Sequence, residues 1–179
     1  SEEKELEEFI AENNLIVKYL INTHCHIDHI LGCEFVKNKF NPIYFAPELD
    51  IPLIQNAKMQ ASFVGMEFSI SLLPDEYLSE DKKLQLGKSE LSFIFTPGHT
   101  PGEFCIYIPD IKSCTTGDVL FNDGIGRTDL WGGNYDTLIS SITDKLLTLP
   151  DDTKIYPGHG ESSTIGREKK FNPFLNHTV

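Results

Sequence analysis

Four side chains that commonly bind metal ions follow directly after the strongest β-type run of this chain. That run, Leu15–Ile21, is rich in aliphatic and β-branched residues and predicts a buried strand. The segment after it contains His24, His26, Asp28 and His29. Side chains two residues apart in an extended segment point to the same side, so His24 and His26 are expected to project together. The turn into the next helix lets Asp28 and His29 face the same cavity.

Imidazole nitrogen and carboxylate oxygen suit zinc and other divalent metals of similar softness. The alternative is a polar surface turn, which we disfavour because four strong ligands so close together are a poor choice for packing alone. Cys25 alternates to the opposite face and is not counted as a ligand, although a thiolate role stays open.

Three further polar residues each follow a predicted strand, on a turn shaped by glycine or proline. They are His99 after strand 91–95, Asp118 after strand 113–116, and His159 after strand 154–156. Strand ends are rigid, and the loops that leave them commonly carry sites. Five histidines and two aspartates would suffice for two metal ions with coordination positions left for water. His177, near the end of the chain, has no such setting and is expected at the surface.

The rest of the chain predicts one domain, over residues 1–179, that mixes helices and strands. Helices are expected over 3–14, 30–39, 48–63 and 135–147, with Asn134 as the cap of the last one. In the second of these helices Leu31, Phe35 and Val36 are expected to face inward. Further strands are expected at 43–45 and 104–108, a hairpin at 84–95, and mostly loop over 65–83.

Composition excludes several classes of protein. The chain has 179 residues and a formal net charge of −12, and such an acidic chain is a poor candidate for binding nucleic acid or an anionic membrane surface. No apolar run approaches the ~20 residues of a membrane helix. The four cysteines form no closely spaced pair, so we expect reduced, partly buried thiols and a cytoplasmic protein.

The ordered set Thr-His-Cys-His-Ile-Asp-His, Thr-Pro-Gly-His-Thr-Pro-Gly, Thr-Gly-Asp and Pro-Gly-His-Gly resembles the metallo-β-lactamase superfamily. Within it, residues 124–130 and the late Ser-Thr-Ile-Gly-Arg-Glu segment resemble small bacterial glyoxalase II-like hydrolases. The resemblance implies an α/β (α+β) fold, the αββα sandwich, without the strands that usually precede the first helix. It also implies metal ligands for one ion (His24, His26, His99), for a second ion (Asp28, His29, His159), and for both (Asp118).

The resemblance further implies a thioesterase that cleaves S-D-lactoylglutathione or a similar thioester with a metal-bridging hydroxide. Asp28 and Asp118 would be the catalytic carboxylates, and zinc is the favoured metal, with iron or manganese as alternatives. Arg127 is the candidate for binding an anionic glutathione conjugate. A bridging Asp118 speaks against β-lactam hydrolysis, and the sequence says nothing about oligomeric state.

Two other readings stay open. One is a mono-iron persulfide dioxygenase of the same fold, in which the resemblance assigns the iron to His24, His99 and Asp118, a two-histidine, one-carboxylate set. The other is a non-catalytic domain that binds a metal or a partner.

Overall fold

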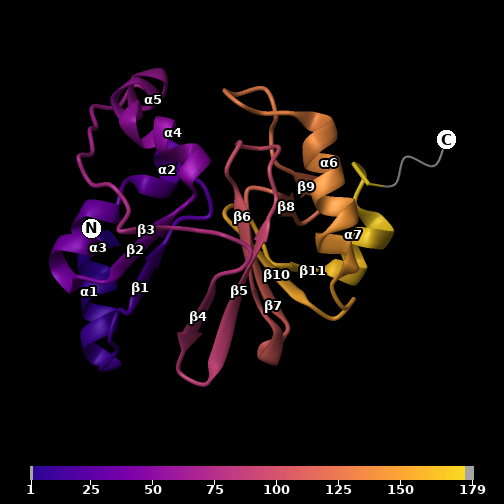
Figure 1. The fold of residues 1–179 in the computed structure, drawn as a ribbon, viewed down its shortest axis with the longest axis horizontal. Coiled ribbons are helices and arrows are strands. Elements are labelled where there is room, and N and C mark those ends of the chain that lie inside the picture. Colours follow the sequence, from indigo (N-terminus) through magenta and orange to yellow (C-terminus); the bar gives the residue numbers. More distant parts are fainter. Residues whose placement is uncertain (1, 176–179) are drawn as a thin grey trace. The chain divides into compact units, whose positions relative to one another are not determined.

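Residues 2–175 are described by the computed structural model, and the chain divides into two units, Ser1–Tyr77 and Leu78–Val179 (Figure 1). His177 lies outside the described residues. The single domain expected from the sequence therefore stays a prediction, and each unit is described by itself.

The first unit contains a parallel three-stranded sheet in the order β1-β2-β3, together with several short helices. Its elements are α1 (Glu2–Glu12), β1 (Tyr19–Ile21), α2 (Ile27–Ile30), α3 (Cys33–Phe40), β2 (Ile43–Ala46), the 3-10 helix η1 (Glu48–Asp50), α4 (Ile51–Gln55), α5 (Ala57–Phe63) and β3 (Glu76–Tyr77). A core that includes Cys25, Ile30, Tyr44 and Ile54 packs these helices against the sheet. The sequence prediction of loop over 65–83 misses the short strand β3.

The first strand is shorter than its sequence predicts. Only Tyr19–Ile21 pairs with β2, while Leu15 is 50% exposed and Ile16 is 91% exposed. The pairing begins opposite Ile43, and the preceding Pro42 has no N–H to extend the ladder. The prediction of a buried strand over 15–21 was therefore wrong for its first half, which is unpaired and largely exposed, and the paired residues Tyr19–Ile21 are only half-buried.

Two predicted helices are each interrupted. The expected helix 30–39 is split, because α2 ends at Ile30 and α3 begins at Cys33 after Gly32. Leu31 lies in the connection and is exposed, which contradicts its predicted inward position, while Phe35 and Val36 are half-buried. The expected helix 48–63 breaks at Asn56.

The break at Asn56 has a local cause. Its backbone lies at φ −104 and ψ 22, outside the helical region, and its side-chain amide donates to the carbonyl of Pro52 at 2.8 Å. Asparagine competes in this way with the regular helical ladder. The result is two short helices where the apolar pattern predicts one.

The second unit is built on a six-stranded sheet in the order β11-β10-β7-β6-β5-β4. Its elements are β4 (Lys83–Leu86), β5 (Ser89–Phe95), β6 (Phe104–Ile108), the 3-10 helix η2 (Pro109–Ile111), β7 (Ser113–Gly117), β8 (Leu120–Phe121), β9 (Gly124–Ile125), α6 (Tyr135–Asp144), the 3-10 helix η3 (Leu146–Thr148), β10 (Lys154–Pro157), β11 (Ser163–Thr164) and α7 (Ile165–Phe171). The predicted strands and hairpin of this half are confirmed.

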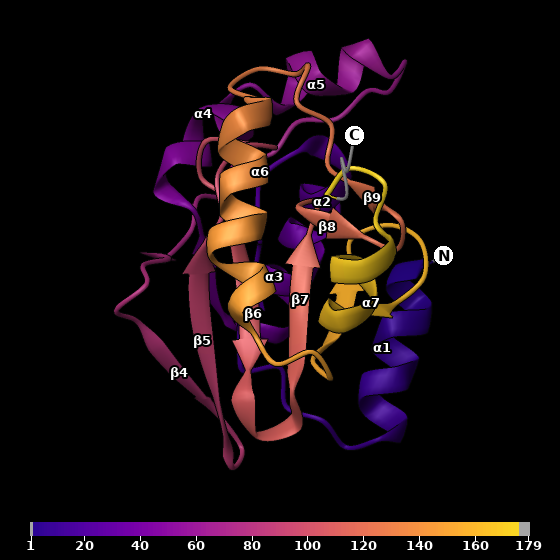
Figure 2. The same ribbon diagram turned by 90° about the vertical axis from the view of Figure 1, so that its right-hand side faces the viewer.

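Helix α6 lies along one face of this sheet (Figure 2). Leu138, Ile142 and Leu146 are fully buried in a core shared with Ile155 and Ile165. The predicted cap is also confirmed, because the side chain of Asn134 accepts a hydrogen bond from the amide of Thr137 at 2.9 Å. Among the described residues, no helix is long and apolar enough to span a bilayer.

Candidate metal centre

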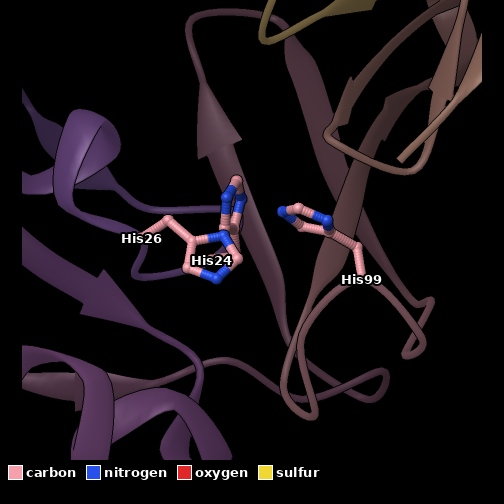
Figure 3. Close-up of side chains that lie close together, drawn as sticks. All are labelled: His24, His26 and His99. Atoms are coloured by element: carbon pink, nitrogen blue, oxygen red, sulfur yellow. The ribbon is translucent and has the colours of Figure 1, made fainter. Parts of the chain in front are cut away.

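The first unit gathers histidines on the segment that leaves β1. The amide of Asn22 still bonds to the carbonyl of Phe45 at 3.0 Å; beyond it the chain bends at Thr23 and His24 and is extended again at His26. The rings of His24 and His26 lie 5.0 Å apart between centroids, and both leave this segment in Figure 3. The two-residue period predicted this placement.

Helix α2 adds the other two candidate ligands of this unit. The ring centroids of His24 and His29 are 4.0 Å apart, and His29 Nε2 lies 3.6 Å from a carboxylate oxygen of Asp28. Residues from two sides of one tight turn thus face one another, as the sequence suggested. Thr23 Oγ1 lies 3.2 Å from His24 Nδ1, which fixes that ring through the nitrogen nearer its backbone.

Three side chains hold this turn in place, and the sequence analysis did not find them. The buried carboxylate of Asp50 accepts a hydrogen bond from the amide of Cys25 at 3.2 Å, between the two histidines. Gln60 accepts from the amide of Ile27 at 3.1 Å, and Asn22 donates to the carbonyl of His29 at 2.6 Å. Each acts on the backbone of the turn, so no pattern of ligand types could have indicated it.

Cys25 itself is an unsuitable ligand. Its side chain is fully buried, and burial together with the carboxylate of Asp50 raises the pKa of the thiol well above its usual value. A raised pKa disfavours the thiolate that metal binding or nucleophilic attack requires. All four cysteines are free and buried, which confirms the expectation of unpaired thiols.

In the second unit, topology brings three strand ends to one edge of the sheet. β7 runs parallel to β10. Both β5 and β7 are antiparallel to β6, so β5 runs in the same direction as β7 and β10. The carboxyl ends of these three strands therefore meet at one edge. The loops that leave them carry His99, Asp118 and His159, as expected from the sequence.

The imidazoles of His99 and His159 both lie close to one carboxylate oxygen of Asp118. Asp118 Oδ2 lies 3.6 Å from His99 Nε2 and 3.6 Å from His159 Nε2. Two ligand atoms on one tetrahedral zinc ion, each about 2.1 Å from it, lie about 3.4 Å apart. His99 and Asp118 are nearly buried, with side-chain exposures of 3% and 11%, whereas His159 is 57% exposed.

The ring of His99 is oriented by the chain that follows β9. Nδ1 lies 2.8 Å from the carbonyl oxygen of Arg127, which can only accept, so Nδ1 donates and Nε2 carries the lone pair of the neutral ring. A carbonyl partner of this kind is common behind a metal-binding imidazole.

Two glycines allow the close packing of these loops. A Cβ on Gly126 would lie 1.8 Å from the carbonyl oxygen of Asp118 and 3.1 Å from the Cβ of His99. Gly98 has a φ of +134°, and a Cβ there would lie 2.3 Å from the backbone nitrogen of Leu138 in α6. The loops that carry His99 and Asp118 therefore pack against the chain at Gly126 and against α6, and neither glycine position has room for a side chain.

The guanidinium of Arg127 forms an ion pair with Asp129. Its guanidinium makes two hydrogen bonds to Asp129, at 2.7 and 2.8 Å, and this contact lowers the pKa of Asp129 to about 2. The pair is largely exposed. The backbone of Arg127 thus serves His99, while its predicted role in binding substrate stays a prediction.

The donor set fits a transition-metal pair. Each unit presents imidazole nitrogens together with a carboxylate, and such sets bind zinc or iron, whereas all-oxygen sets suit calcium or magnesium. Asp28 in the first unit and His159 in the second are each partly exposed, with side-chain exposures of 48% and 57%.

Comparison with known proteins establishes the class. Residues 1–159 match the Metallo-beta-lactamase superfamily, and the chain belongs to this family. The chain is 42% identical to "Hydroxyacylglutathione hydrolase GloC" of Haemophilus influenzae over 169 residues, covering 93% of this chain and 80% of that protein.

Two solved structures share the fold. "TTHA1623 in a di-iron-bound form" has a TM-score of 0.87 at 31% identity, covering 96% of this chain and 84% of the other. "BLEG-1 B3 metallo-beta-lactamase" has a TM-score of 0.85 at 32% identity, covering 97% and 84%. The family and the fold expected from the sequence are thereby confirmed, and the chain is a hydrolase-type protein of this superfamily.

Proposed function

We propose that the chain is a glyoxalase II-like thioesterase that uses two divalent metal ions to hydrolyse S-D-lactoylglutathione or a similar thioester. The observation that carries the proposal is the pair of imidazole nitrogens at 3.6 Å from Asp118 Oδ2, which is the spacing of ligands that share ions. The similarity to a hydroxyacylglutathione hydrolase supports the choice of substrate class.

The proposed ligands are divided between the two ions as the resemblance of their motifs implies. One ion is assigned to His24, His26 and His99, and the other to Asp28, His29 and His159. Asp118 is assigned to both ions, as the resemblance implies. The ligands thus come from both units of the chain.

When bound, the ion pair would supply a water of lowered pKa, from about 15.7 toward ~7, and polarise the thioester carbonyl. Asp28 and Asp118 are the carboxylates we place to accept a hydrogen bond from the attacking water. The carbonyl of Arg127 accepts from Nδ1 of His99, so in the neutral ring the lone pair lies on Nε2, which faces Asp118. The departing thiol has an ordinary pKa of ~8.5 and leaves as thiolate, so no side chain is needed as its acid.

The first test is elemental analysis of protein purified without added metal, followed by assays on a thioester panel. We expect about two zinc, iron or manganese ions per chain and hydrolysis of glutathione thioesters. Loaded wild-type protein that hydrolyses no thioester would exclude the thioesterase. Turnover of a β-lactam instead would contradict the argument that rests on Asp118.

Asp118→Ala should lower kcat by about 100-fold or more and reduce the number of bound ions, because it removes the shared ligand. The matched control is Asp136→Asn, which changes an exposed carboxylate in the first turn of α6. It should leave kcat and the number of bound ions unchanged. Wild-type activity in Asp118→Ala would overturn the assignment.

A persulfide dioxygenase is the second candidate, and the similarity to a protein solved in a di-iron-bound form favours testing for iron. The two activities differ in a simple measurement. One iron per chain with oxygen uptake on glutathione persulfide would replace the thioesterase proposal, whereas metal binding without any turnover would indicate a non-catalytic domain.

A further inference from the structure

Glu103 buries a carboxylate behind the candidate metal ligands of the second unit. It lies immediately before β6, its side chain is fully buried, and its Oε1 accepts a hydrogen bond from the amide of Asp118 at 2.7 Å. A buried carboxylate is costly unless hydrogen bonds compensate it, and a bond to a charged acceptor is stronger than one between neutral groups. This bond fixes the backbone of the residue whose side chain lies between two imidazoles.

The backbone of the same residue closes the loop that carries His99. The carbonyl of Glu103 accepts from the amide of Thr96 at 2.8 Å, so residues 96 and 103 are joined across the base of the loop. Within that loop, the amide of Gly98 bonds to the carbonyl of Thr100 at 3.0 Å. Glu103 therefore connects two ligand-bearing loops, one through its main chain and one through its side chain.

We propose that Glu103 is a positioning residue that holds Asp118 at the metal centre by binding its amide. The inference rests on the proposed function, because it takes Asp118 as the shared ligand. The residues behind metal ligands orient them, and their loss commonly weakens metal binding or activity 10–100-fold.

A second buried glutamate in the same unit provides a matched control. Glu168 is also fully buried, and its Oε2 accepts from the amide of Asp123 at 2.9 Å and from the side chain of Asn172 at 2.9 Å. Asn172 also donates to the carbonyl of Gly124 at 3.0 Å. Glu168 thus fixes the turn between β8 and β9, and its Oε1 also accepts from Ser163 and Arg167, whereas Glu103 binds the amide of a proposed ligand.

The experiment compares Glu103→Met and Glu103→Gln with Glu168→Met and Glu168→Gln. Methionine keeps most of the volume but cannot accept the amide hydrogen bond, and glutamine keeps an accepting oxygen. Three quantities are measured for each variant: the zinc dissociation constants by chelator competition, the melting temperature, and kcat and KM on a glutathione thioester.

We expect Glu103→Met to weaken zinc binding by about 10- to 100-fold and to lower kcat with little change in KM. Glu103→Gln should recover most of both losses. Glu168→Met should lower the melting temperature while the folded protein keeps its zinc affinity, since the turn it holds bears no proposed ligand.

Wild-type zinc affinity in Glu103→Met would overturn the proposal, and so would equal losses of zinc affinity in the two methionine variants. If Glu103→Met does not fold, Glu103→Gln keeps the proposal falsifiable, because this variant retains an accepting oxygen and should therefore retain most of the zinc affinity. A loss of zinc affinity in folded Glu103→Gln as large as that in Asp118→Ala would overturn the role of the accepted hydrogen bond. Because chelator competition needs no turnover, a wild-type protein that binds zinc but cleaves no thioester would refute the proposed function and leave this test intact.

Discussion

Asp118 shows how single residues are prepared for metal binding in the second unit. Its side chain lies between two imidazole nitrogens, and its amide donates a hydrogen bond to Glu103. Its carbonyl oxygen packs so closely against Gly126 that no Cβ would fit there. All three contacts restrict the position of one carboxylate. A ligand held in this way loses little conformational freedom when an ion binds, which favours tight binding.

The pairing of Arg127 gives a prediction about substrate binding. Asp129→Ala should lower KM for an anionic glutathione thioester, because it removes both acceptors of the guanidinium. Arg127→Ala should raise KM, and raising salt from about 20 to about 300 mM should raise KM in the wild type by screening. Asp123→Ala is the control, because it removes an equivalent carboxylate partner from Arg167, which still donates to Asn122 and Glu168. An unchanged KM across this salt range would exclude electrostatic capture by Arg127.

The candidate ligands could be predicted from the sequence because each group of them follows directly after a predicted strand. The residues that support them could not. Asp50, Gln60 and Glu103 act on backbone amides, and a hydrogen bond to an amide requires no particular spacing from the residue it serves. Only the folded chain shows which amide each one reaches.

At the scale of elements, the loops depend on contacts that exclude side chains. Gly98 combines a left-handed φ with close packing against α6, where the amide of Asn134 also bonds to its carbonyl at 2.8 Å. The loop that carries His99 is therefore attached to the start of the helix that covers the sheet.

Gly98→Ala should destabilise the protein by roughly 2–4 kcal/mol, since the new Cβ meets helix backbone and the φ is strained. Gly87→Ala is the matched control, because Gly87 also has a positive φ but its Cβ would meet nothing within 4 Å. It should cost about 1 kcal/mol. Urea denaturation measures both, and equal losses would contradict the packing argument.

Asp75 gives a pH-dependent prediction for the first unit. It accepts from the amide of Tyr44 at 2.8 Å and from Lys37 at 2.5 Å, and these bonds lower its pKa. Because the folded pKa lies below the unfolded value of ~3.9, the stabilisation is present above that pH and is lost as pH falls through the folded pKa.

Asp75→Asn should therefore be less stable than the wild type at pH 7, and the difference should shrink below about pH 4. Asp81→Asn, at an exposed aspartate, is the control. Unfolding free energies at pH 7 and about pH 3 test this, and a difference that grows on acidification would contradict it.

The elements themselves were predicted unequally. The hairpin followed from two β-type runs around the turn at Gly87, and α6 from an apolar stripe and the cap at Asn134. Both were found, although α6 ends at Asp144 rather than at Leu147. The first half of strand 15–21 and the interruptions at Gly32 and Asn56 were missed, because pairing partners and local side-chain bonds decide them. The apolar pattern of the sequence contains no information about strand partners or about local side-chain hydrogen bonds.

For the whole molecule, the proposed ligands belong to two units, so metal binding should couple their stabilities. We expect chelator-treated protein to unfold in two calorimetric transitions and zinc-loaded protein in one, at a higher temperature. Free zinc at about 1,000 times its dissociation constant would add about 4 kcal/mol of stability. The two-histidine variant His24→Ala/His159→Ala is the control, and a wild-type melting temperature unaffected by zinc would contradict the coupling.

The buried thiols offer a way to follow each unit separately. Burial raises the pKa of Cys33 to about 11 and raises that of Cys105 as well, so both resist alkylation while the protein is folded. Cys25 and Cys33 belong to the first unit, and Cys105 and Cys114 to the second. Timed iodoacetamide labelling with peptide mass spectrometry would thus record which half opens first, with no engineered probe.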